Sequence, residues 1–214
     1  VINNVRSAAT SILNGLSDAI SDVAFGVASY FGDPVEPAND FDNAYNVLQP
    51  ITTAGADAIS SMNNWVASGG DDWPEANFYA LQQAATNGAD TNGGSGSGEA
   101  TGWRDGAAKV LLWFGDADSH TTTVSEAEAI QAAIDNGVTV IAFNSSSSGV
   151  GLDLNSQAGN VSSATGGSLI NNFSNLSGDA LVDAILGSIN VVTSTFDLDL
   201  FAVGDTSGLD VSFT

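Results

Sequence analysis

Three short apolar runs constrain the fold of this 214-residue chain more than any other feature. Residues 23–31 (VAFGVASYF), 108–115 (AKVLLWFG) and 138–143 (VTVIAF) are rich in β-branched and aromatic residues and show little alternation with polar ones. Such runs are typical of strands buried on both faces, which occur in parallel sheets covered by helices on each side. The runs therefore predict a doubly wound α/β fold.

Amphipathic helices are expected between and around these strands. The first, over residues 1–21, has apolar residues at three- and four-residue steps and no capping residue before Val1. Thr53 is expected to cap the second helix, and Pro50 to end the short strand before it. The remaining expected elements are helices over 53–67, from Glu75 to about 85, over 125–136 and over 179–189, and strands over 46–49 and 168–173.

The last segment departs from the alternation of strands and helices. Residues 195–203 alternate apolar residues with Asp197 and Asp199, a Gly-Asp-Thr-Ser-Gly turn follows, and residues 209–213 are largely apolar again. This pattern predicts a β-hairpin that begins or borders a further β module. The expected organisation is a main domain over 1–192 and the hairpin over 193–214. We interpret Asp197 and Asp199 as the solvated face of the first hairpin strand.

The charge of the chain excludes several kinds of partner. It has 25 acidic and 3 basic side chains, a formal net charge of −22, and no cysteine. Nucleic acids and anionic membrane surfaces are bound by clusters of Lys and Arg, so neither is expected as a partner. No apolar run approaches the roughly 18 residues of a membrane span, so membrane insertion is not expected either. The absence of cysteine excludes disulfides, thiolate metal sites and a cysteine nucleophile.

Acidic residues gather where the predicted strands end. Asp33 follows the first long strand, Asp71 and Asp72 lie in the loop before a helix, and Asp116 and Asp118 follow the second long strand. Ligand sites of open α/β sheets lie at the carboxyl ends of the strands. Carboxylates with no basic residues nearby favour Ca²⁺ or Mg²⁺. The alternative is that these residues are turn residues and helix caps, positions where Asp is common.

Three segments resemble those of a known family. Residues 23–34 (VAFGVASYFGDP) resemble a strand and the Phe-x-Asp-Lys-Pro-like turn after it, and residues 69–85 (GGDDWPEANFYALQQAA) resemble a proline-glutamate metal loop and its helix. Residues 101–120 (TGWRDGAAKVLLWFGDADSH) resemble a Gly-Trp-Arg-x-Asp segment, a strand ending in Asp-Ala and a nearby His. With these segments the chain resembles the von Willebrand factor A domain, closest to the βI domain of integrin β subunits, over residues 1–200.

The resemblance implies a Rossmann-like sheet that carries a metal-ion-dependent adhesion site. In the family, an Asp-x-Ser-x-Ser loop, a Glu and a strand-end Asp hold a divalent cation, which binds an acidic residue of the ligand. By matched position, Glu75 is that Glu, Asp116 is the strand-end Asp, and Asp33 belongs to a neighbouring calcium site. The metal ligands implied in this way are Asp33, Asp72, the carbonyl of Pro74, Glu75 and Asp116, with Asp71 and Asp118 as further candidates.

Two departures from the family pattern affect this site. The chain contains no Asp-x-Ser-x-Ser, and the central strand that carries it in the family would precede residue 1. We therefore expect a gap between the strands over 23–31 and 108–115, unless the hairpin over 196–213, from the same chain or a swapped neighbour, fills it. The second departure is Gly70, where the family has an Asn ligand for which Asp71 could compensate.

The resemblance favours a binding module over an enzyme. His120, the single histidine, is interpreted as a loop residue, because no Gly-x-Ser-x-Gly elbow or other nucleophile motif is present. The expected function is divalent-cation-dependent protein binding or adhesion, with Ca²⁺ as cofactor, Mg²⁺ or Mn²⁺ as alternatives, and a protein that presents a carboxylate as partner. The alternative is a calcium-stabilised structural domain that self-associates, as a dimer that strand swapping could join, and a subunit associated with an enzyme ranks third.

The composition also bears on where such a protein acts. A strongly acidic chain without cysteine differs from animal integrins, which use disulfides. We therefore expect an exported prokaryotic protein, located outside the cell or at its surface.

Overall fold

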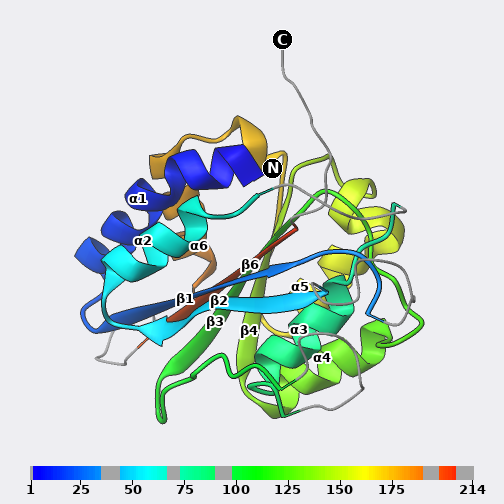
Figure 1. The fold of residues 1–214 in the computed structure, drawn as a ribbon. Helices are drawn as coiled ribbons and strands as arrows, with labels where there is room; N and C mark the ends of the chain where they lie inside the picture. Colours follow the sequence, from blue (N-terminus) through cyan, green and yellow to red (C-terminus); the bar gives the residue numbers. More distant parts are fainter. Residues whose placement is uncertain (1, 35–43, 67–72, 90–97, 190–197, 206–214) are drawn as a thin grey trace.

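Helices cover both faces of a central sheet in the computed structural model of the chain (Figure 1). The structure describes residues 2–34, 44–66, 73–89, 98–189 and 198–205. On one face lie α1 (Ile2–Ala19), α2 (Gly55–Asn63) and α6 (Gly178–Ser188). On the other lie α3 (Asn77–Ala85), α4 (Glu126–Asp135) and α5 (Gln157–Ala164). The expected α/β architecture with two helical layers is confirmed.

The sheet is mostly parallel. In the described residues its strand order is β2-β1-β6-β3-β4-β5, and β2 is antiparallel to β1 whereas the other neighbouring pairs are parallel. The central strands are buried on both faces, as the apolar runs predict, and β1 is buried along its whole length. The strands are β1 (Val23–Tyr30), β2 (Tyr45–Thr52), β3 (Ala108–Gly115), β4 (Val138–Asn144), β5 (Leu169–Asn171) and β6 (Leu198–Asp205). Short 3-10 helices follow β4 and β5, η2 (Gly151–Ser156) and η3 (Phe173–Asn175).

Strand β6, the last of the described strands in chain order, lies between β1 and β3 (Figure 1). It pairs with β1 along its whole length, from Leu198 opposite Val23 to Asp205 opposite Tyr30, and it pairs with β3 on its other side. The C-terminal segment therefore fills the position where the sequence predicts a gap or a replacement strand. Residues 206–214, which would hold the second strand of the expected hairpin, lie outside the described residues, so the hairpin stays a prediction.

Several element boundaries differ from the sequence-based expectations: α2 also ends at Asn63 rather than near 67, and β5 covers only Leu169–Asn171. Two of the differences have a clear physical reason. Strand β2 continues through Pro50 to Thr52, because it pairs only with β1 and an edge strand tolerates the missing N–H of proline, here beside an irregularity in the pairing. Helix α2 begins at Gly55, and the hydroxyl of Thr52 rather than that of Thr53 accepts a hydrogen bond from the Ala54 N–H (3.1 Å). Thr53 is therefore not the cap.

Helix α4 begins and ends as its sequence predicts. The Ser125 hydroxyl accepts the Glu128 N–H (3.3 Å), and the Glu128 carboxylate accepts the Ser125 N–H (2.8 Å), which completes a capping box. The Ser125 hydroxyl also donates to the Glu128 carboxylate (2.7 Å). The hydrogen bonds that this carboxylate accepts, first from the Ser125 N–H and then from the Ser125 hydroxyl, lower the pKa of Glu128. After the helix, Gly137 adopts a φ of +66°, which ends the helix at little steric cost.

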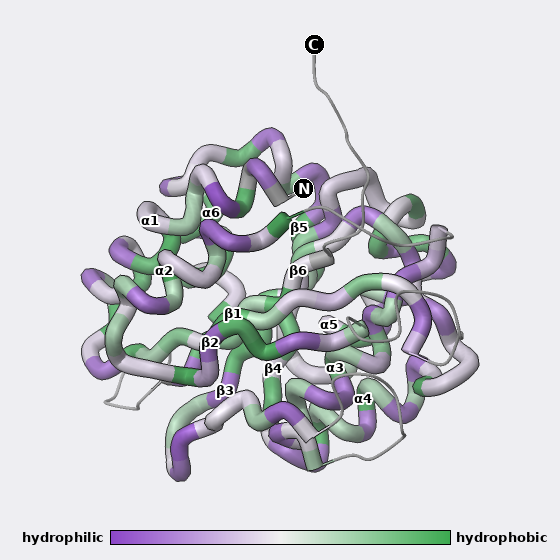
Figure 2. The backbone as a smooth tube through the Cα atoms, in the orientation of Figure 1, coloured by the Kyte–Doolittle hydropathy of each residue, from purple (hydrophilic) through white to green (hydrophobic). Residues whose placement is uncertain are grey.

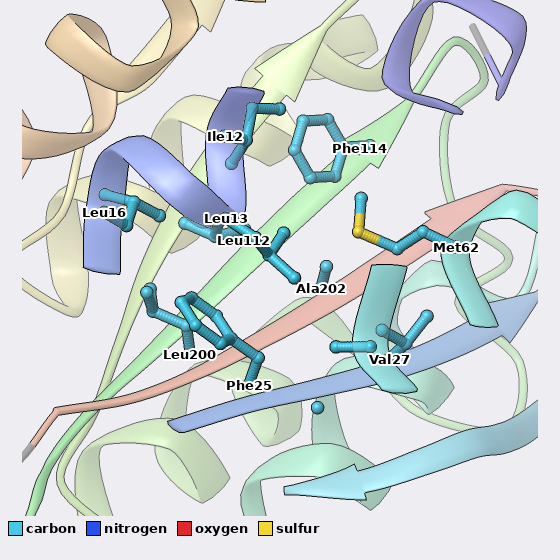
Figure 3. Close-up of a pocket in the computed structure, with 12 residues that line it drawn as sticks. Ile12, Leu13, Leu16, Phe25, Val27, Met62, Leu112, Phe114, Leu200 and Ala202 are labelled. Atoms are coloured by element: carbon cyan, nitrogen blue, oxygen red, sulfur yellow. The ribbon is translucent and has the colours of Figure 1, made fainter. Parts of the chain in front are cut away.

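Two apolar cores flank the sheet, and β6 contributes to both. Figure 2 shows hydrophobic residues along β1 and β4 at the centre of the molecule. Leu200 and Ala202 of β6 pack toward α1, α2 and α6, whereas Phe201 and Val203 pack toward α3, α4 and α5. A small apolar cavity remains between α1, α2 and the sheet, and Met62 and Ala202 are among the residues that line it (Figure 3).

A buried ion pair holds β6 near the amino ends of the strands. The Asp199 side chain is fully buried, and its carboxylate accepts hydrogen bonds from the backbone N–H and the Nε of Arg104. The guanidinium also donates to the side chain and carbonyl of Asp22, each at 2.9 Å. Burial alone would lower the pKa of Arg104, but the hydrogen bonds to Asp199 and Asp22 outweigh it, so the pKa is raised. The prediction of a solvated Asp199 is wrong because β6 is covered on both faces; Asp197 lies outside the described residues.

Close packing in the sheet predicts that Gly26→Ala destabilises the protein. A Cβ at Gly26 would lie 2.5 Å from the Phe201 ring and 2.9 Å from a side-chain carbon of Ile51, so we expect a loss of about 1–3 kcal/mol in the free energy of unfolding. The matched control is Gly187→Ala in α6, where nothing lies within 4 Å of the new Cβ and the helix gains about 0.5 kcal/mol. Urea unfolding of both variants measures the difference, and equal stability of the two would contradict the packing described here.

The ion pair predicts a large loss of stability for Arg104→Gln. This change leaves the buried Asp199 carboxylate without its cation, which we expect to cost about 3–5 kcal/mol in urea unfolding. Lys109→Gln is the control, because it removes the same charge but only one hydrogen bond to the Asn136 carbonyl (3.0 Å), at a cost of about 1 kcal/mol. Addition of Asp199→Asn to Arg104→Gln is expected to recover part of the loss. Similar losses in the two single variants would show that the pair contributes little.

Candidate functional site

Three segments far apart in the sequence meet at the carboxyl ends of the strands. The Gly32 N–H, in the loop after β1, donates to a carboxylate oxygen of Glu75, which precedes α3. In the same loop, the Asp33 carboxylate lies 3.5 Å from Nδ1 of His120, which follows β3. Glu75 and Ser119 form a parallel bridge, in which the Glu75 N–H donates to the Asp118 carbonyl (2.8 Å). These contacts bring together the loops in which the sequence places metal ligands.

An asparagine that no sequence motif singled out holds these loops in place. The Asn77 amide nitrogen donates to the Asp118 carbonyl (2.9 Å), and its amide oxygen accepts a hydrogen bond from the Trp113 indole N–H (3.1 Å). Asn77 is fully buried at the start of α3, so both halves of its amide need partners. Its position two residues after the Pro-Glu pair is the one sequence signal that could have marked it.

A buried serine and a glutamine complete the support of the loop after β3. The Ser119 hydroxyl accepts the Phe78 N–H at the start of α3 (2.9 Å), and the Ser119 N–H donates to the side-chain oxygen of Gln157 at the start of α5 (2.7 Å). Ser119 is 4% exposed, which makes it a structural residue of the loop rather than an accessible hydroxyl. His120, beside it, keeps the loop position that the sequence predicts for it.

The predicted metal ligands differ in exposure. Glu75 is 2% exposed and Asp33 is 8% exposed, whereas Pro74, Asp116 and Asp118 are half-buried. One oxygen of Asp118, Oδ1, is buried and has no hydrogen-bond partner in the described part of the chain. Because burial of a polar atom without a partner is unfavourable, this oxygen is suited to a ligand. Gly70, Asp71 and Asp72 lie outside the described residues.

The register of β6 adds an acidic position that sequence reasoning missed. The backbone of Asp205 lies opposite Tyr30, at the end of the central strand, so Asp33, Asp205 and Asp116 stand at or just after the ends of three neighbouring strands. Residues 205–207 are Asp-Thr-Ser, which matches the first three positions of the family's Asp-x-Ser-x-Ser, and residue 209 is leucine where the second serine would be. This partial match could have been found only by searching the C-terminal segment for a central strand.

A complete metal site is not observed in the described residues. Within residues 2–34, 44–66, 73–89, 98–189 and 198–205, no three His, Asp or Glu side chains form a group that could hold a metal ion. Asp33 and Glu75 are brought together through Gly32 and His120, but the contacts described for Asp116 do not extend to them. The assignment of these residues to a metal therefore stays a prediction.

The three basic residues of the chain have their described contacts elsewhere. Arg104 binds Asp22 and Asp199, Lys109 donates to a carbonyl after α4, and Arg6 donates to the Trp65 carbonyl (3.2 Å). The acidic residues at the carboxyl edge thus face an imidazole and backbone N–H groups in the contacts described here.

No helix in the described part of the chain has the length and apolar character of a membrane span. A comparison of the sequence with models of known protein families finds no match, and neither does a comparison with curated proteins.

Proposed function

We propose that this chain is a divalent-cation-dependent protein-binding module of the adhesion type, acting outside the cell or at its surface. The observation that carries the proposal is the junction of the Asp33, Glu75 and Asp118 loops at the carboxyl edge of the sheet. The described contacts of Lys and Arg lie away from this junction. The resemblance of the same segments to an integrin βI domain supports the same function.

The donor set fits a hard divalent cation. Carboxylate and carbonyl oxygens are the preferred ligands of Ca²⁺, and Glu75, Asp33 and the buried Oδ1 of Asp118 supply this chemistry. Asp116, Asp72, Asp71 and the Pro74 carbonyl belong to the same proposed set. The cation would supply positive charge for a carboxylate of the partner. The chain's own residues would hold it, with Asn77 and Ser119 fixing the loops.

The proposal predicts that Glu75→Gln and Asp116→Asn weaken Ca²⁺ binding. We expect each change to raise the Kd by about tenfold to a hundredfold in calorimetric titrations with Ca²⁺, Mg²⁺ and Mn²⁺, because each removes a charged ligand oxygen. A glutamine at position 75 retains an oxygen that can accept the Gly32 N–H, so the fold should persist.

Asp183→Asn is the matched control for these titrations. It removes the same charge from an exposed position on α6, on the surface of a helix, and is expected to leave the Kd unchanged. Folded Glu75→Gln and Asp116→Asn variants that bind Ca²⁺ as tightly as the wild type would refute the site assignment. A wild-type chain that binds none of the three ions would refute the proposed function.

A calcium-stabilised structural domain that self-associates is the second candidate. The observation in its favour is that the junction ties together segments around residues 32, 75 and 120, so a cation there would resist their separation during unfolding. This function needs no external partner. A neighbouring copy of the chain would take the place of that partner.

The two candidates predict different responses to a chelator. Both expect Ca²⁺ to raise the free energy of unfolding, by about 2.7 kcal/mol at a hundredfold excess over the Kd. Only the second expects the mass in solution, measured by light scattering, to fall from oligomer to monomer when EDTA is added. A monomer under both conditions supports the binding module and contradicts metal-linked assembly.

A further inference from the structure

We propose that β6 exchanges between two copies of this chain, so that each copy accepts the partner's β6 between its own β1 and β3 in a reciprocal strand-swapped dimer. The proposal concerns strand pairing along the whole of β6 and does not depend on metal binding at the carboxyl ends of the strands. In the dimer, the β6 of a second copy of this chain lies between β1 and β3.

The first support is the pairing of β6. All its described strand partners are β1 and β3, which lie far away in the sequence, and the pairing is parallel on both sides. No tight turn fixes β6 to either neighbour, since parallel neighbours need a long connection. The same strand from a second copy can therefore form the same hydrogen bonds. In the exchanged dimer each copy loses the contacts of its own β6 and gains the same contacts from the β6 of the other copy.

The second support is the place of β6 in the chain order. It is the last described strand, and the segment between α6 and Leu198 is its one connection to the elements described before it. Withdrawal of β6 leaves the β2–β1 pair and the β3–β4–β5 unit with their own pairings intact. Among the described strands, exchange therefore requires only β6 to move, and exchange of an identical element between copies is a low-cost route to a dimer.

The third support is that the position between β1 and β3 cannot remain empty once β6 leaves it. Leu200 and Phe201 are 2% and 0% exposed, and they fill opposite faces of the sheet. Without β6, β1 and β3 would present two unpaired edges between apolar layers, which is a strong template for another strand. The Asp199 carboxylate favours β6 over other strands, because once buried it needs the ion pair with Arg104. In the dimer it would pair with the Arg104 of the other copy.

Cysteine pairs test the exchange directly, since the chain has no cysteine of its own. Val27 and Ala202 are paired neighbours in β1 and β6, and both line the apolar cavity, which leaves room for sulfur. A Val27→Cys chain and an Ala202→Cys chain are unfolded, mixed at high concentration and refolded in EDTA under oxidising conditions. A covalent heterodimer is expected on a non-reducing gel, at least about fivefold more abundant than with the control pair Ala202→Cys and Gln131→Cys, whose second cysteine lies on the exposed face of α4.

Two further measurements test the exchange without the mixed single-cysteine chains. The wild-type chain, refolded at high concentration in EDTA, is expected to give a dimer by light scattering, and its absence would overturn the proposal. The Val27→Cys/Ala202→Cys chain, oxidised as a dilute monomer, is expected to give no dimer after concentration. A heterodimer yield no higher than that of the control pair, or a dimer that still forms from the locked chain, would likewise overturn it.

Discussion

Strand β6 is hydrogen-bonded to β1 on one side and to β3 on the other, and it joins two parts of the sheet that share no other strand pairing among the described residues. Its side chains also alternate between the two apolar cores, with Leu200 on one face and Phe201 on the other. The helical layers on both faces consequently pack against one continuous sheet only because β6 completes it.

A strand buried in this way is an unfavourable place for a carboxylate, and Asp199 is tolerated there because it accepts hydrogen bonds from both the backbone N–H and the Nε of Arg104. The chain has only 3 basic residues against 25 acidic ones, so this pairing uses a scarce group. Lys109 lies at the same amino end of the sheet, at the start of β3, where its ammonium donates to the carbonyl of Asn136, the C-cap residue of α4. Two of the three basic residues thus form their described contacts at the amino ends of the strands.

The architecture could be predicted from the sequence because the apolar runs over 23–31, 108–115 and 138–143 specify strands by local composition. The role of β6 could not be read in the same way. Its alternation of apolar residues with Asp197 and Asp199 is typical of a strand with one solvent-exposed face. Only the pairing of β6 with distant strands reveals that Asp199 is buried. The extension of β2 through Pro50 has the same origin, since an edge position is a property of the whole sheet.

The place of the candidate site could be predicted from the sequence, because the loops at the carboxyl ends of parallel strands form the ligand sites of open α/β sheets. The loops that hold Asp33 and Glu75 meet through the Gly32 N–H, whereas the role of Asn77 and the backbone position of Asp205 depend on packing and register that no local pattern encodes. The carboxyl edge is also where α3 begins, two residues after Glu75, so the partial positive charge of its first N–H groups compensates part of the acidic charge. The His120 imidazole lies beside Asp33, 3.5 Å from its carboxylate. A divalent cation would be a larger source of compensation at the same edge, and it is the one that could also attract a partner's carboxylate.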